Sequence, residues 1–263
     1  MMTHSEQVPI PMKGSAIHLL IERLSAGTLL AEPERQALAE ASTRTVVVAR
    51  DQTLARPGQN LTDCHVLASG LAAAYKLLPD GKRQIVGFLL PGDFVDLEAY
   101  VSETMDYSVT ALSSCSLAVI PHAVLRRLSA DHPSIALALW RETLLNAAIH
   151  REWVVNVGQR MASERLAHLI CEMSARLESR GLARDEDEGK SFTWPVTQAD
   201  IADATGMSTV HVNRTIQELR ARELIRFRQQ EVTVLDWPGL QNLAGFDPDY
   251  LLPASKRPSL HLQ

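Results

Sequence analysis

Asn213, Arg214 and Gln217 bring two amides and a guanidinium together within a short stretch of the chain. With Val210 they stand at positions i, i+3, i+4 and i+7, so a helix would carry all four side chains on one face. Amide and guanidinium groups hydrogen-bond base edges in the major groove, where an arginine can make two parallel bonds to guanine. This face is therefore expected to read DNA sequence, with contact to a thymine methyl group as one role open to Val210.

Two short helices separated by a tight turn are expected to hold this face outward. Thr197 can cap the first helix together with Asp200 three residues later, and Gly206 ends it where a left-handed conformation is needed. Ser208 caps the second helix, whose opposite face is apolar. Three residues at i, i+4 and i+7 form that inward face: Val212, Ile216 and Leu219.

The next residues predict a small β-hairpin and a local surplus of positive charge. Residues 224–235 contain two β-type runs that turn through Gln229, Gln230 and Glu231. Residues 214–228 hold five Arg and two Glu, although the chain has a net charge of −5. A helix pair followed by a hairpin is the winged form of a helix-turn-helix, and the positive charge suits a DNA backbone. The simpler alternative is an αα-hairpin whose polar face is only solvated.

The segment VTQADIADATGMSTVHVNRTIQELRARELI, residues 196–225, resembles the DNA-binding end of the Crp/Fnr family of bacterial transcription regulators. The resemblance implies a homodimer on a near-palindromic DNA operator, with reading helices about 34–36 Å apart, and RNA polymerase as a further partner. The resemblance also adds Thr209 to the predicted base-reading residues, because the cyclic-AMP-binding members have an Arg at this position. It also implies phosphate contacts from four residues: Thr197, Gln198, Ser208 and His211.

Composition and cysteine usage limit the class of protein. The chain has 263 residues, 46 % of them hydrophobic and 22 % charged, which suits a globular protein of two modest domains. No apolar run reaches the roughly 18 residues of a membrane span, and the N-terminus has no export-signal pattern. Cys64, Cys115 and Cys171 lie far apart, which is typical of reduced thiols rather than disulfides or a zinc site. We expect a cytoplasmic protein.

Residues 45–120 have the pattern of an antiparallel β-structure. Short β-type runs alternate with breakers such as Pro57-Gly58 and Asp80-Gly81 at intervals of eleven or twelve residues. This spacing favours a barrel or jelly roll, and a β-sandwich stays open as an alternative. The stretches PGQ, SG, DGK and GFLLPGDFVDLEAY resemble the β-roll sensor domain of the same family. The predicted class is α+β, with an N-terminal antiparallel β-roll, a long helix and a C-terminal winged helix-turn-helix.

A long helix after Pro133 is apolar on two sides. One side contains Ile135, Leu139, Leu145 and Ile149, and the other follows a four-three spacing that Arg151 interrupts. Such a helix needs two partners, for which the resemblance suggests the β-roll and a second copy of the chain; burial within one chain is the alternative. The predicted dimer contacts are Leu137, Trp140, Leu144, Ala147 and Val154.

The sensor-pocket positions differ from those of the cyclic-AMP-binding members that the chain resembles. In those members a Glu contacts the ribose and an Arg pairs with the cyclic phosphate, a contact that a neutral side chain cannot replace. Here GDFV is followed by DLE instead of GEL, Tyr-Ser replaces Arg-Ser, and Leu-Asn replaces the Thr-Ser pair at adenine. We therefore expect no binding of cyclic AMP. Another effector would meet Asp96, Glu98, Tyr107, Ser108, Leu145 and Asn146.

The sequence predicts no cofactor, metal site or enzymatic activity. The oxygen-sensing members hold an iron–sulfur cluster on N-terminal cysteines, but the first cysteine here is Cys64. His65 or His122 could ligate haem iron, although histidines held by local hydrogen bonds are commoner. A cupin-like metal enzyme would need clustered ligands, and residues 45–120 contain a single histidine, His65. The other alternative is a ligand-binding module whose helix pair docks a protein instead of DNA.

The predicted boundaries divide the chain into four parts. They are a β-roll sensor domain (13–132), a dimerisation helix (133–158), a DNA-binding domain (159–240) and a C-terminal extension (241–263). Two amphipathic helices are expected within residues 17–41. The four consecutive acids at 185–188 predict a solvated loop away from DNA. Residues 1–12 and 253–263 are expected to be loose tails.

Overall fold

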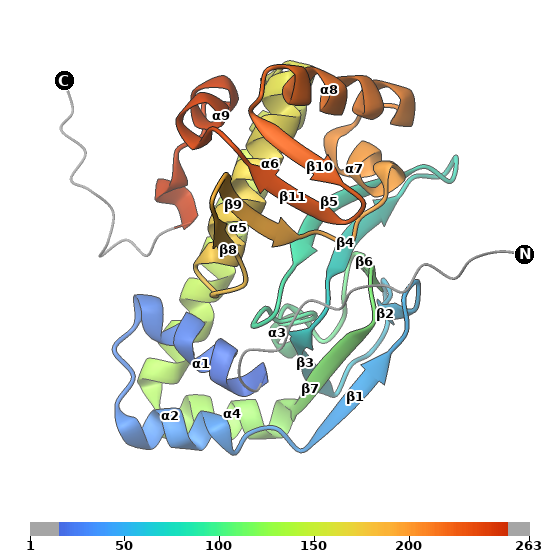
Figure 1. Ribbon diagram of the computed structural model, residues 1–263. Coiled ribbons are helices and arrows are strands. Elements are labelled where there is room, and N and C mark those ends of the chain that lie inside the picture. The colour runs from blue at the N-terminus through green and yellow to red at the C-terminus, as the bar shows by residue number, and fades with distance from the viewer. Residues whose placement is uncertain (1–15, 252–263) are drawn as a thin grey trace, which may run out of the picture.

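The computed structural model describes residues 16–251, which form a β-rich half and a half built on helices, joined by one long helix (Figure 1). The predicted α+β class, with a β-roll, a long helix and a C-terminal winged helix-turn-helix, is confirmed. Both predicted tails lie outside the described residues. Within residues 16–251, no helix combines the length and the apolar character needed to cross a membrane.

The β-roll consists of two antiparallel sheets, with strand orders β1-β7-β3 and β2-β6-β4-β5. Its strands are β1 (Arg44–Val48), β2 (Thr53–Ala55), β3 (Asp63–Ser69), β4 (Ala72–Leu77), β5 (Arg83–Leu89), β6 (Ser108–Ala111) and β7 (Cys115–Pro121). The short β-type runs of the sequence predicted each of these strands except β2. That strand has three residues and a register shift against β6, so it is too short to show an alternating pattern.

The predicted breakers are turns with glycines at positive φ. Gly70, between β3 and β4, has φ +92°. A β-carbon there would lie 2.4 Å from the backbone oxygen of Ser114, so both the conformation and the close approach require glycine.

Helices cover the β-roll and connect it to the rest of the chain. They are α1 (Ala16–Gly27), α2 (Glu32–Ala39), α3 (Ala99–Ser102), α4 (His122–Asp131) and the 27-residue α5 (Pro133–Gln159). The two helices expected within residues 17–41 are confirmed as α1 and α2. α1 packs against β3, β7 and α5, so the N-terminal helix fixes the long helix to the β-roll.

The C-terminal half contains the winged helix-turn-helix and a four-stranded sheet of order β10-β11-β9-β8. Its elements are α6 (Ala162–Glu178), β8 (Arg184–Glu186), β9 (Gly189–Thr193), α7 (Gln198–Thr205), α8 (Thr209–Ala221), β10 (Ile225–Arg228), β11 (Glu231–Val234), α9 (Trp237–Ala244) and the 3-10 helix η1 (Pro248–Leu251). Glu231 belongs to β11, so the wing turns through Gln229 and Gln230 alone.

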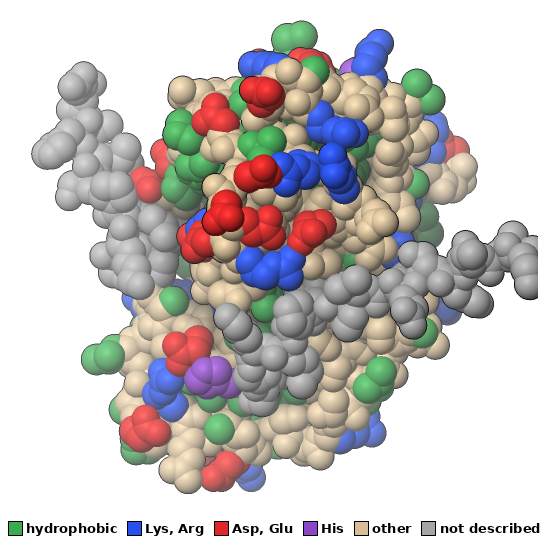
Figure 2. All heavy atoms as spheres, in the orientation of Figure 1, with side chains coloured by type: hydrophobic (Ala, Val, Ile, Leu, Met, Phe, Trp, Pro, Cys, Tyr) green, Lys and Arg blue, Asp and Glu red, His purple; other side chains and the backbone are tan. Residues whose placement is uncertain are grey.

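A loop was predicted at the acidic run, and this prediction is wrong, because these residues form the end of one strand and the turn of a β-hairpin. β8 and β9 pair antiparallel and turn at Asp187 and Glu188. Cross-strand cations offset the negative charge: Lys190 lies 3.4 Å from Asp185, and Arg226 on β10 is paired with Glu188. Figure 2 shows the acidic side chains gathered over this hairpin, with Lys and Arg side chains beside them.

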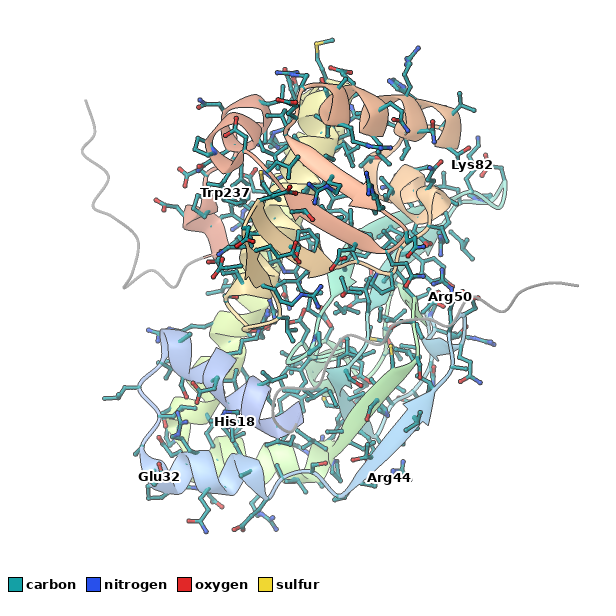
Figure 3. The ribbon with its side chains drawn as sticks, in the orientation of Figure 1. His18, Glu32, Arg44, Arg50, Lys82 and Trp237 are labelled. Atoms are coloured by element: carbon teal, nitrogen blue, oxygen red, sulfur yellow. The ribbon has the colours of Figure 1, made fainter. Side chains whose placement is uncertain are left out.

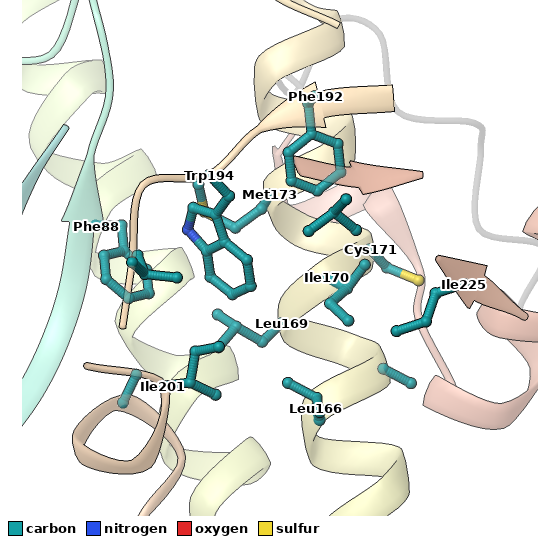
Figure 4. Packing of buried hydrophobic residues seen from close by; sticks show 14 of the residues in the cluster. Phe88, Leu166, Leu169, Ile170, Cys171, Met173, Phe192, Trp194, Ile201 and Ile225 are labelled. Carbon is teal, nitrogen blue, oxygen red and sulfur yellow. The ribbon is translucent and has the colours of Figure 1, made fainter. Parts of the chain in front are cut away.

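One hydrophobic core continues from the β-roll into the DNA-binding half. Phe88 on β5 contacts Trp153 on α5 and Trp194, which precedes α7, with ring centroids 5.7 and 5.8 Å away and edge-to-face geometry. Figure 4 shows Phe88 and Trp194 facing the apolar side of α6. Burial of these aromatic side chains stabilises the arrangement of the two halves.

Buried ion pairs reinforce the same junction. Asp93, in the Pro-Gly-Asp turn of the β-roll, is paired with Arg23 on α1, with Arg176 at 3.1 Å and with Arg180 at 2.6 Å. Burial opposes ionisation of Asp93, but Arg180, Arg23 and Arg176 outweigh it and lower the pKa of its carboxyl. Arg50, on the β1–β2 turn, donates to the backbone oxygen of Pro195 at 3.2 Å, just before α7 (Figure 3).

Candidate nucleic-acid interface

The first helix of the pair, α7, begins and ends as predicted. Thr197 Oγ1 accepts a hydrogen bond from the Asp200 backbone N–H at 3.1 Å, and the Asp200 carboxylate accepts one from the Thr197 N–H at 2.9 Å. This reciprocal capping box satisfies two backbone donors that have no partner within the helix. Gly206 follows α7 in the left-handed conformation, with φ +65°.

The second helix, α8, separates an inward apolar face from an outward polar face. Ser208 Oγ accepts a hydrogen bond from the His211 N–H at 3.2 Å, which confirms the predicted cap. Val212, Ile216 and Leu219 are buried, as predicted. The residues predicted to read bases are all exposed, Val210 to 78 %: Thr209, Val210, Asn213, Arg214 and Gln217. Their side chains are therefore accessible to a groove of DNA.

The residues predicted to contact phosphate lie at the N-termini of two helices. Thr197 and Gln198 open α7, and Ser208 and His211 open α8. Three of them are exposed and His211 is half-buried. Helix N-termini favour anions because their free N–H groups and the helix dipole carry positive potential. Each of these N-termini can therefore hold a phosphate of the DNA backbone.

A groove of about 320 Å³ lies between α7, α8 and the wing. Gln198, Asn213 and Gln217 line it, together with Arg220 from the end of α8 and Gln229 from the wing turn. Arg220 donates to Gln217 Oε1 at 3.3 Å. Arg220 and Gln229 were not among the predicted DNA contacts. The surplus of arginine in residues 214–228 and the position of the wing turn were the signals for them.

The charges around α8 fall into two groups. Arg222 lies 3.8 Å from Glu218, and Arg226 is paired with Glu188. Arg214, Arg220 and Arg228 have no ion-pair partner among residues 16–251. Their guanidinium groups remain available to an anionic partner, and this local excess suits the phosphate backbone of DNA.

The outer side of α5 is an apolar stripe without a partner in the described chain. Of the five residues predicted to form the dimer contact, four are exposed and Ala147 is half-buried. Trp140 is 74 % exposed, which is unusual for so large an apolar side chain. The opposite side of α5 packs inward through Ile135, Leu139 and Ile149, with Leu145 half-buried.

The side chains at the predicted effector pocket are engaged with one another. Asp96 is fully buried and accepts hydrogen bonds from the His65 backbone N–H at 2.7 Å and its ring Nδ1 at 2.6 Å. Tyr107 donates to Glu98 at 2.9 Å. Burial and the Glu98 charge raise the pKa of Tyr107, so it stays a neutral donor. Ser108 is buried, and Leu145 and Asn146 on α5 are half-buried.

None of these six positions supplies a cation for a cyclic phosphate. Glu98 contributes a negative charge, and His150 on α5 faces Gly87 of β5. Burial lowers the pKa of His150, which favours its neutral form. The chemistry of the donor set therefore does not fit a cyclic nucleotide anion.

The cysteines and histidines considered as cofactor ligands have local structural roles. Cys64, Cys115 and Cys171 are buried free thiols, and burial raises the pKa of each. His65 is held by Asp96, and His122 is buried with its ring edge-on to Tyr100. Among the residues that the structure describes, no group of three or more His, Cys, Asp or Glu side chains is placed to hold a metal ion.

Comparison with known proteins gives two family matches and a set of relatives. Residues 45–132 match the family model of the cyclic nucleotide-binding domain, and residues 164–243 that of the Crp-like helix-turn-helix domain. The transcriptional activatory protein AadR of Rhodopseudomonas palustris is 30 % identical over 170 residues, which cover 65 % of this chain and 68 % of AadR. The transcriptional activator protein FnrL of Cereibacter sphaeroides is 28 % identical over 203 residues, 77 % of this chain and 81 % of FnrL.

Solved structures share the fold. FixK2 from Bradyrhizobium japonicum superimposes with a TM-score of 0.69 at 22 % identity, over 78 % of this chain and 98 % of FixK2. TTHB099, a CRP-family transcriptional regulator from Thermus thermophilus, gives a TM-score of 0.60 at 24 % identity, over 76 % and 97 % of the two chains. The combination of a β-roll, a long helix and a winged helix-turn-helix is therefore an architecture already seen in solved proteins.

Proposed function

This chain belongs to the Crp/Fnr family of DNA-binding transcription regulators, and on that basis we propose that it binds a near-palindromic operator as a homodimer. The observation that carries the proposal is the outward face of α8, where Arg214 is exposed and has no ion-pair partner among the described residues. α7 and α8 are both capped and packed on a shared core, so this face is rigid before DNA is bound. Rigid presentation lowers the entropy cost of binding.

Each residue of the face has a proposed role. Arg214 forms a fork onto the O6 and N7 atoms of a guanine, and Asn213 and Gln217 bond neighbouring bases. Val210 packs on a thymine methyl group, and Thr209 lies beside it at the start of α8. The phosphate contacts come from Thr197, Gln198, Ser208 and His211.

Dimerisation through α5 is supported by the exposed apolar stripe around Trp140. Pairing two α5 helices through Leu137, Trp140, Leu144, Ala147 and Val154 would remove these side chains from water. It would also place the two α8 helices on one side of the dimer, which suits half-sites about one turn of DNA apart.

We do not assign cyclic AMP as the effector, because the pocket offers Glu98 and Tyr107 where a phosphate needs a cation. The curated relatives AadR and FnrL are named as activators, and we place this chain with them. Contact with RNA polymerase and a cytoplasmic location follow from that role. No catalytic reaction is assigned.

Selection of bound sequences from random duplex DNA tests the proposal. Purified protein should enrich one near-palindromic site, and its affinity should fall steeply with added salt because phosphate contacts release counterions. A parallel selection with cell extract reports whether a small molecule is required. Salt-insensitive binding, or no enriched sequence under either condition, would contradict the proposal and favour a helix pair that docks a protein.

A further inference from the structure

Glu172, on α6, is a fully buried carboxylate that joins three elements of the chain. Trp153 of α5 donates its ring N–H to both carboxylate oxygens at 3.1 Å. Arg176, one turn along α6, donates at 3.1 Å, and the Tyr250 hydroxyl of η1 donates at 2.8 Å. A buried carboxylate is tolerated only when its lone pairs are satisfied, so each of these donors is needed.

The three elements meet near the connection between α5 and α6, residues 160–161, which we call the hinge. α5 ends at Gln159 and α6 begins at Ala162, so two residues separate the helix that carries the apolar stripe from the helix on which α8 packs. The angle between α5 and α6 therefore determines where α8 lies relative to any second copy of the chain. The Trp153–Glu172 hydrogen bond crosses this angle directly.

The chain after α9 forms a strap across the hinge, which we define as residues 246–251. α9 packs on α6, and η1 then lies against both α5 and α6. The Tyr250 ring stacks on His168 of α6 at 6.2 Å, and Phe246 contacts both rings edge-on. Burial and the Glu172 carboxylate raise the pKa of Tyr250, so its hydroxyl keeps its proton and remains a donor.

The hinge itself is tied to the end of α9, just before the strap. Arg160, between α5 and α6, donates to the backbone oxygen of Ala244 at 3.2 Å and to Glu152 of α5 at 3.3 Å. The strap also lies beyond the match to the Crp-like helix-turn-helix domain, which ends at residue 243. It is therefore an addition to the matched domain that packs on both helices of the hinge.

We infer that Tyr250 and Glu172 are positioning residues, which fix the α5–α6 angle and thereby the distance between the two reading helices of the dimer. This inference rests on the proposed homodimer. A role limited to folding would change stability alone. Loss of a positioning residue lowers the affinity for two half-sites at a given spacing. The affinity for a single half-site stays the same.

The test compares Tyr250→Phe with the parent protein on three kinds of DNA. These are the selected palindrome, a duplex with one half-site, and palindromes whose spacer is one or two base pairs longer or shorter. Tyr250→Phe keeps the ring and removes only the donor to Glu172. We expect a roughly tenfold loss on the palindrome, less than about twofold on the single half-site, and a weaker preference for one spacer.

Tyr100→Phe is the matched control, because its hydroxyl donates to Ser129 within the β-roll half, at 3.3 Å. It should leave all three measurements unchanged. If Tyr250→Phe does not fold, Glu172→Gln keeps the size of the side chain and should show the same pattern. An unchanged ratio of palindrome to half-site affinity in a folded variant overturns the positioning role. If the parent shows no preference for the palindrome, the homodimer proposal fails as well.

Discussion

The guanidinium of Arg83, at the start of β5, lies 2.6 Å from the carboxylate of Asp200 on α7. It also donates to Asp203, one turn further along α7, at 2.7 Å. Burial opposes ionisation of Asp200, but its bonds to Thr197 and Arg83 lower the pKa of its carboxyl. The β4–β5 hairpin of the β-roll therefore holds the first helix of the helix-turn-helix by charge-assisted hydrogen bonds.

Arg83→Ala should lower the free energy of unfolding by about 1–3 kcal/mol, because the buried Asp200 loses a charged donor. Urea unfolding at neutral pH measures the change. Lys82→Ala is the matched control on the same hairpin, since Lys82 is exposed and pairs with Asp80, within the same turn, at 2.7 Å. Its cost should stay below about 1 kcal/mol. Equal costs for the two variants would show that the Arg83 contact adds nothing to the junction.

Trp140→Glu should weaken dimerisation by at least about 30-fold, because it places a charge within the α5 stripe at its largest side chain. Sedimentation equilibrium measures the monomer–dimer constant. Val101→Glu, on α3, is the control, because Val101 is also apolar and 80 % exposed but lies outside the stripe. A Trp140→Glu protein that stays dimeric at the parent's concentration range would rule out this interface.

Gln198→Ala should weaken binding to the operator and to unrelated DNA by the same factor, roughly two- to tenfold. One hydrogen bond to a phosphate is lost, and that contact carries no sequence information. Fluorescence anisotropy with both duplexes measures the two affinities. Gln36→Ala on α2, whose side chain bonds Glu40 at 3.2 Å, should change neither. A loss confined to the operator would mean that Gln198 reads a base.

His168→Phe should make the protein less sensitive to acid. Glu152 lies 3.6 Å from His168 Nε2, but burial and the nearby Arg160 outweigh it and lower the pKa of His168 to about 3. Below about pH 6.5 the unfolded chain therefore binds a proton that the folded protein excludes. As the pH falls from that value towards 3, this difference lowers the free energy of unfolding. The limiting slope is about 1.4 kcal/mol per pH unit.

The measurement for this prediction is the free energy of unfolding between pH 7 and 5, in the parent and in His168→Phe. Phenylalanine retains a flat ring against Tyr250, which contacts His168 by stacking. The parent should lose more stability than the variant over this range. Identical pH slopes would show that His168 has the same pKa in the folded protein as in the unfolded chain.

The helix pair was predictable because its signals are local. Thr197 and Ser208 satisfy backbone donors within three residues, and Gly206 supplies a conformation that other residues avoid. The alternation and the turn glycines of the β-roll are local in the same sense. Each of these patterns indicates its structure without knowledge of the rest of the chain.

Contacts between distant residues were not predictable from local patterns. The acids at 185–188 have the composition of a solvated loop, and they form a hairpin because Arg184 pairs with Glu231 and Arg226 with Glu188. The Phe88–Trp194 contact and the Tyr250–Glu172 bond also join parts of the chain whose proximity depends on the complete fold. The assignment of DNA contacts to single residues stays a prediction for the same reason, because it depends on a partner molecule.

The most direct test of DNA reading by α8 is base selection with Arg214→Ala beside the parent. Arg222→Ala is the control, because Arg222 follows α8 and lies 3.8 Å from Glu218. We expect the parent and the control to select the same guanine in each half-site. Arg214→Ala should lose that preference, with roughly 1–3 kcal/mol less discrimination at one position. Unchanged affinity and unchanged base preference in Arg214→Ala would contradict the account.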